Sequence, residues 1–123
     1  RGAKGMSTIY YGPEKFGLVV VAELDTADSV GYNKVMVWRR QIDSVLVWGA
    51  DSGCSCPVPF EDVGINDLRP LITTRDAFEA AITEARRYKE DVSEAVNRFR
   101  RRVATATRER DKIQSGRALQ DGP

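Results

Sequence analysis

The sequence Trp-Gly-Ala-Asp-Ser-Gly-Cys-Ser-Cys-Pro-Val-Pro-Phe-Glu-Asp, residues 48–62, separates a strand-rich half of the chain from a helix-rich half. Gly49 and Gly53 permit backbone angles that a β-carbon forbids, while Pro57 and Pro59 fix φ and push the preceding residue toward an extended conformation. These residues predict a loop of defined shape that holds both cysteines. Its structured positions are expected to be Asp51, Gly53, Cys54, Cys56, Pro57 and Phe60.

Three stretches rich in β-branched residues precede this loop, at residues 16–24, 33–40 and 44–50, and predict three strands. The first strand would place four apolar side chains on one face: Leu18, Val20, Ala22 and Leu24. Trp38 and Trp48 occupy corresponding places in the next two strands and are expected to meet as a cross-strand pair. Short connections predict a three-stranded antiparallel meander, whose apolar face needs a cover.

A long helix is expected to supply that cover. Residues 63–72 predict an irregular or single-turn helical connector, and Thr73 with Asp76 resembles a capping box. We therefore expect a sheet domain over residues 6–72, one helix over 73–114 and a flexible tail over 115–123. Apolar side chains recur along this helix at alternating spacings of four and three, at Phe78, Ile82, Ala85, Val92, Val96, Phe99, Val103, Ala106 and Ile113.

This sustained seven-residue period favours a left-handed coiled coil over a simple amphipathic surface helix. An unbroken helix of this length would extend about 60 Å at about 1.5 Å per residue, which is longer than the sheet. The part beyond the sheet would expose its apolar stripe unless it paired with another copy. The sequence thus predicts an α+β fold and a homodimer formed through this seam, with Lys89 and Arg110 as polar interruptions.

Composition narrows the class of protein. The chain of 123 residues has a net charge of +1 and contains no histidine, which excludes a histidine-based catalytic triad and removes the commonest zinc ligand. No apolar run approaches the roughly 20 residues of a membrane span, so we expect one soluble cytosolic domain with no membrane partner. Residues 1–5 are expected to be an artificial extension, with Met6 as the native first residue.

The two cysteines allow three interpretations. A Cys54–Cys56 disulfide would close a very small ring with poor geometry, and a zinc site would need two further ligands from a second chain or from nearby carboxylates. Structural thiols are the favoured interpretation, with a reactive thiol next, and we expect no cofactor or metal. Asp51, Glu61 and Asp62 could act as acid and base, but a structural role is favoured, with Asp51 accepting backbone N–H groups in a turn.

Basic residues are concentrated late in the predicted helix. Residues 98–112 contain seven cations against Glu109 and Asp111. A basic stripe at Arg98, Arg101, Arg102 and Arg108 could lie along a phosphate backbone, which gives a nucleic-acid-binding alternative. The competing interpretation, which we favour, pairs these arginines with acidic residues near the start of the helix, such as Glu79 and Glu84.

Three parts of the sequence resemble a family of small proteins encoded by bacteriophages of actinobacteria. They are the segment Tyr-Tyr-Gly-Pro-Glu-Lys-Phe-Gly-Leu at residues 10–18, the Val37-Trp38 pair, and the block Asp-Ser-Gly-Cys-Ser-Cys-Pro-Val-Pro-Phe-Glu-Asp at residues 51–62. The resemblance covers the sheet half and the loop. It implies an accessory protein of unknown function in the host cytoplasm and transfers no catalytic residue.

The sequence therefore predicts a non-enzymatic phage accessory protein. It would act as a protein–protein interaction module that binds a host protein and associates with itself through the C-terminal helix. Nucleic-acid binding through the basic stripe is the alternative.

Overall fold

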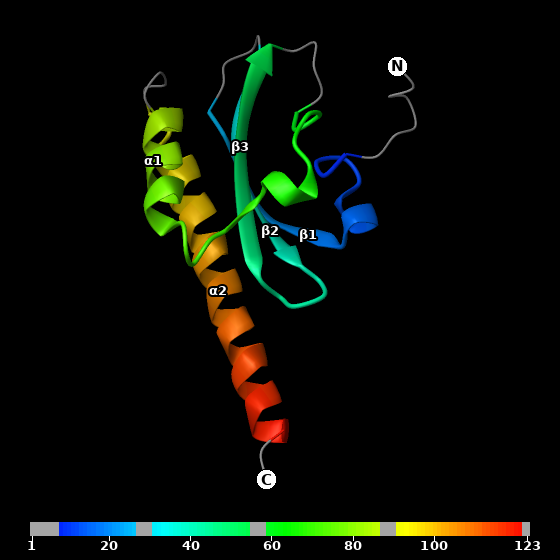
Figure 1. Ribbon diagram of the computed structural model, residues 1–123. Coiled ribbons are helices and arrows are strands. Elements are labelled where there is room, and N and C mark those ends of the chain that lie inside the picture. The colour runs from blue at the N-terminus through cyan, green and yellow to red at the C-terminus, as the bar shows by residue number, and fades with distance from the viewer. Residues whose placement is uncertain (1–7, 27–30, 55–58, 87–90, 122–123) are drawn as a thin grey trace.

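The computed structural model describes residues 8–26, 31–54, 59–86 and 91–121, and it shows an α+β fold (Figure 1). One antiparallel sheet contains four strands in the order of the chain: β1 (Leu18–Asp25), β2 (Gly31–Arg40), β3 (Leu46–Cys54) and β4 (Arg69–Pro70). Two helices follow, α1 (Arg75–Arg86) and α2 (Ser93–Asp121), and two 3-10 turns, η1 (Pro13–Phe16) and η2 (Ile65–Asp67), lie in the connections. The predicted class is confirmed, but the sheet has four strands rather than three.

The additional strand, β4, lies within the connector that was predicted to be irregular or a single helical turn. It is two residues long and pairs Pro70 with Val47 and Arg69 with Trp48. A proline has no N–H to donate to a ladder, so it is tolerated at the edge of a sheet, where β4 lies. The helical part of the prediction corresponds to η2.

A β-bulge in β1 changes which side chains share a face. The pairing with β2 shifts between Val20 and Ala22, so the simple alternation of β1 is broken there. Leu18 packs with Met36 and Trp38 on one face, while Ala22 and Leu24 pack on the other. The prediction that Leu18, Val20, Ala22 and Leu24 share one face is therefore wrong.

The sheet is covered on both faces (Figure 1). On one face, β-strand residues such as Val37 and Trp48 pack under α1 and α2. On the other face, Trp38 packs with Phe60 and with Ile9 from the N-terminal segment. The predicted cross-strand tryptophan pair is wrong, because the register aligns Trp38 with Val47 and Val37 with Trp48, which places the two indoles on opposite faces.

The helical half contains two helices rather than the single one predicted over residues 73–114. α1 ends at Arg86 and α2 begins at Ser93. The first helix starts one residue later than the predicted capping box: Thr74 accepts the amide of Phe78, and its hydroxyl accepts the Trp48 indole N–H at 2.8 Å. This hydrogen bond fixes the start of α1 against β3.

The apolar seam packs on the sheet of its own chain. Six of the nine seam side chains are at most 5% exposed: Phe78, Ile82, Ala85, Val96, Phe99 and Val103. Val92 and Ala106 are partly buried against them, and the side chain of Ile113 lies outside the described part of the structure. The physical reason is that two shorter helices can lie side by side across the sheet, so the stripe needs no second copy to cover it.

Candidate binding groove

A groove runs between the outermost strand β1 and helix α2. Two adjoining cavities of about 580 and 460 Å³ share Val20, Val21, Arg98 and Arg102, so they form one continuous depression. We call it the β1–α2 groove. Val20 is 42% exposed, which is unusual for a valine in a strand of this sheet. No other strand among the described residues pairs with the outer edge of β1.

Four arginines line the groove. Arg98, Arg101 and Arg102 come from α2, and Arg39 comes from the end of β2, where it pairs with Val19. Their convergence follows from the periods of the two elements. Residues three and four apart lie on one side of a helix, and Arg39 lies on the same face of β2 as Val37, which packs under the helices.

The carboxylates of Glu23, Asp25 and Glu109 also line the groove, but three of its four arginines form no ion pair among the described residues. Arg98 donates to Glu94 at 3.1 Å in an exposed pair one helical turn away. Among the described residues, Arg39, Arg101 and Arg102 take part in no ion pair. Burying such cations against a partner is favourable only if that partner supplies compensating negative charge.

The two acidic residues of β1 line the groove and contact Lys34. Lys34, which is 7% exposed, contacts the carboxylates of both Glu23 and Asp25, the latter at 2.8 Å. Burial acts to lower the pKa of Lys34, but its hydrogen bonds to Asp25 and Glu23 outweigh burial, so the pKa is raised. Tyr10 donates to Glu23 at 2.9 Å, and its ring lies 5.1 Å from the Lys34 ammonium. Lys34 therefore neutralises part of the charge of these two acids.

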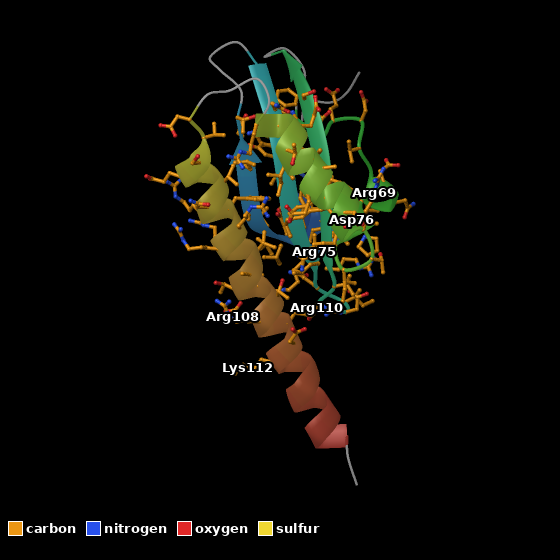
Figure 2. The ribbon with its side chains drawn as sticks, turned by 90° about the vertical axis from the view of Figure 1, so that its left-hand side faces the viewer. Arg69, Arg75, Asp76, Arg108, Arg110 and Lys112 are labelled. Atoms are coloured by element: carbon orange, nitrogen blue, oxygen red, sulfur yellow. The ribbon has the colours of Figure 1, made fainter. Side chains whose placement is uncertain are left out.

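Three of the four predicted nucleic-acid contacts line the groove. The exception is Arg108, which does not line it and instead donates to Thr105 Oγ1 at 3.2 Å. Figure 2 shows Arg108 and Arg110 on different sides of α2. Sequence reasoning missed Arg39 and the valines of β1, because nothing in the linear pattern places the end of β2 beneath a helix sixty residues later.

Two ion pairs among the described residues fit the favoured pairing of late arginines with early acidic residues: Arg98 with Glu94, described above, and Arg100 with Glu79. Arg100 on α2 and Glu79 on α1 form an ion pair at 2.7 Å. The hydrogen bond from Arg100 lowers the pKa of Glu79, and the bond to Glu79 raises the pKa of Arg100. Arg100 lies outside the groove, so this pair joins the helices and leaves the groove charge unchanged.

Asp51 lies in β3 and not in the predicted turn, but it accepts a backbone N–H as predicted. Its carboxylate accepts the backbone amide of Phe60 at 2.7 Å and the Tyr32 hydroxyl at 3.2 Å. A β-carbon on Gly53 would lie 3.0 Å from that hydroxyl oxygen, so the ring of Tyr32 needs the space. Cys56 and Pro57 lie outside the described residues, as does the side chain of Cys54.

Neither a metal centre nor a membrane span is found in the described part of the chain. No three His, Cys, Asp or Glu side chains there are close enough together to hold a metal ion. Within the same residues, neither helix has the combination of length and apolar character that crossing a bilayer requires.

Comparison with known proteins identifies a family but no function. No curated protein and no solved structure matches the chain. One family model matches residues 7–110, which cover the sheet, the loop, α1 and most of the described side chains of α2. The chain therefore belongs to the family described as Domain of unknown function (DUF7574).

Proposed function

We propose that this domain is a non-enzymatic protein–protein interaction module whose β1–α2 groove binds an extended acidic segment of a partner protein. The observation that carries the proposal is the convergence of Arg39, Arg101 and Arg102 on the groove without an ion pair among the described residues. Carboxylates are their natural partners, because a guanidinium binds them with two parallel hydrogen bonds.

The apolar part of the groove favours a polypeptide. Val19, Val20 and Val21 lie along it, next to the unpaired edge of β1. An extended peptide can place apolar side chains on these valines and acidic side chains on the arginines, because its side chains alternate in direction. The bulge at Val20–Ala22 interrupts the edge, so strand pairing with the partner would be short and the arginines would contribute most of the affinity.

Nucleic-acid binding is the second candidate. Arg101, Arg108 and Lys112 are spaced seven and four residues apart and so lie along one side of α2, where they could follow a phosphate backbone. Two features make this candidate weaker. Phe99, an aromatic side chain in the groove lining, is 2% exposed and offers no free face on which a base could stack, and Glu109 lies in the groove beside the arginines.

The biological setting of the proposal comes from the sequence motif. The Asp-Ser-Gly-Cys-Ser-Cys-Pro block resembles that of small actinobacteriophage proteins, so the acidic partner would be a host protein in the bacterial cytoplasm. Nothing in this setting requires catalysis by the domain.

Fluorescence anisotropy with a labelled peptide tests the proposal. The probe alternates Glu and Val over about eight residues, which spans about 26 Å when extended. We expect Arg102→Gln and Arg39→Gln each to weaken binding about tenfold, the loss typical of one buried charged hydrogen-bonding pair. Arg108→Gln is the matched control, because it removes the same charge from α2 outside the groove and should leave peptide affinity unchanged.

Two further ligands separate the candidates. A peptide with Gln in place of Glu should bind far more weakly, since it cannot neutralise the arginines. A DNA duplex that bound more tightly than the acidic peptide, with Arg108→Gln as damaging as Arg102→Gln, would reject the groove proposal and establish the nucleic-acid candidate instead. Equal binding of the Glu and Gln peptides would also reject the proposal.

A further inference from the structure

We infer that a second, smaller cavity binds a carboxylate carried by a short aliphatic chain. This cavity, of about 90 Å³, lies between the start of β3, the β4–α1 connection and α2. Its lining includes Leu46, Leu71 and Ile72 as apolar residues and Arg75 and Arg110 as cations. It shares no lining residue with the β1–α2 groove, so the inference is independent of the proposed function.

Arg110 supplies the strongest reason to expect a ligand. Its side chain is only 18% exposed, and its Nε–H is buried without a hydrogen-bond partner among the described residues. A terminal guanidinium nitrogen of Arg110 lies 3.7 Å from Asp111 Oδ1. This distance is longer than that of a hydrogen bond. A buried charged donor without an acceptor is costly, and a turn of the guanidinium group toward the cavity would let a bound anion accept from it.

Arg75 lies on the other wall. It is the first residue of α1, and both it and Arg110 line the cavity (Figure 2). The partial positive charge at a helix N-terminus adds to the two guanidinium charges. Asp111 offsets part of this charge, but it is 67% exposed and extends toward solvent more than Arg110 does. The cation pair therefore favours one carboxylate between the two guanidinium groups.

The apolar residues of the cavity indicate the chemistry of the rest of the ligand. Leu46 and Leu71 are at most 5% exposed and form an apolar floor, while Ile72 is 73% exposed at the rim. The volume of about 90 Å³ is several times the roughly 10–15 Å³ that one water molecule requires, so the cavity has room for a carboxylate on a short aliphatic chain. Such a group could come from a free short-chain acid or from the C-terminus of a polypeptide that ends in an aliphatic residue.

NMR titration tests this inference on the full chain. The probes are butyrate for a free acid, N-acetylvaline for a chain terminus, butyramide as the uncharged analogue of butyrate, and inorganic phosphate as an anion without an apolar part. The readouts are the side-chain Nε–H signal of Arg110 and the methyl signals of Leu46, Leu71 and Ile72. For ligands of this size we expect dissociation constants on the order of millimolar.

Variants assign the effect to the two arginines. Arg110→Gln and Arg75→Gln should weaken butyrate binding about tenfold or more, while Arg108→Gln, on a different side of α2, should not. Arg110→Lys keeps the charge but removes Nε–H, so it should also lose most of the affinity while preserving the fold, which circular dichroism checks.

The titration results either support or overturn the inference. Saturable shifts with either carboxylate support the inference, and the tighter of butyrate and N-acetylvaline identifies the source of the group. Butyramide or phosphate binding as tightly as butyrate would overturn it, as would full affinity in Arg110→Lys. No saturable shift of the Arg110 Nε–H signal with any probe would overturn it as well.

Discussion

Gly49 lets the segment that follows the loop lie directly on the sheet. A β-carbon at this position would be 2.9 Å from Leu68 Cδ2 and 3.5 Å from a ring carbon of Phe60, both of which are buried in the same cluster. We expect Gly49→Ala to lower the free energy of unfolding by about 1–3 kcal/mol through overpacking. Chemical denaturation measures this loss.

The control for this prediction is Gly64→Ala, because a β-carbon there would meet only Asp67 Oδ2 at an ordinary 3.6 Å. A loss in Gly49→Ala no larger than in Gly64→Ala would mean that Leu68 and Phe60 can move aside at little cost.

Residue-level chemistry was predictable where it depends on local sequence. Asp51 was expected to accept a backbone N–H because its short carboxylate side chain stands near glycines and prolines, and it accepts that of Phe60, although it lies in β3 and not in a turn. The cross-strand pairing of Trp38 and Trp48 was not predictable, since it depends on register. A shift of one residue moves a side chain to the opposite face of a sheet.

At the scale of elements, the ion pair between Arg100 and Glu79 joins α1 to α2. The hydrogen bond from Arg100 lowers the pKa of Glu79 below its ordinary value of 4.5. A lowered folded-state pKa means that the pair stabilises the fold above pH 4.5 and that this contribution disappears as the pH falls through the folded-state pKa.

We therefore expect Glu79→Gln to be less stable than the wild type near neutral pH, by no more than about 1 kcal/mol because both side chains are partly exposed. The difference should shrink in acid. Urea denaturation as a function of pH measures it, with Glu94→Gln, whose carboxylate is 86% exposed, as a control of smaller effect. A difference that stayed constant between neutral and acidic pH would contradict the assignment.

The helical elements show how far a hydrophobic period can be interpreted. The four-three spacing identified the buried side chains correctly, including Ile82 and Phe99. It could not identify what covers them, because a stripe that faces a sheet and a stripe that faces another helix have the same period. Their packing identifies the sheet as the cover, because Ile82 and Phe99 lie in one buried cluster with strand residues such as Val37.

At the scale of the whole molecule, the net charge of +1 conceals an uneven surface. The sequence predicted a basic stripe on the C-terminal helix, and three of its four arginines line the β1–α2 groove. The other half of the groove comes from β1 and from Arg39, which only the tertiary fold brings beneath α2. The second cavity likewise joins residues from β3, α1 and α2, so it had no signal in the sequence.

The packing of the seam leads to a prediction for the whole chain. Val96 and Phe99, on the side of α2 that faces the sheet, are each 2% exposed. Placing a carboxylate at both positions would bury two unpaired charges, which costs several kcal/mol each and approaches the total stability of about 5–15 kcal/mol for a small domain. We expect the double variant Val96→Asp, Phe99→Asp to lose cooperative thermal unfolding altogether.

Circular dichroism melts and light scattering on the same samples distinguish this result from the disruption of a coiled coil. If the seam held two copies together, the double variant would show half the mass with its fold retained. If the seam packs on the sheet of its own chain, the cooperative melt is lost whatever the mass of the wild type.

Ala104→Asp is the control. Ala104 lies on the exposed side of α2, so this variant should melt as the wild type does. A cooperative melt in the double variant would contradict the intramolecular core, because that core cannot hold two ionised carboxylates and stay folded.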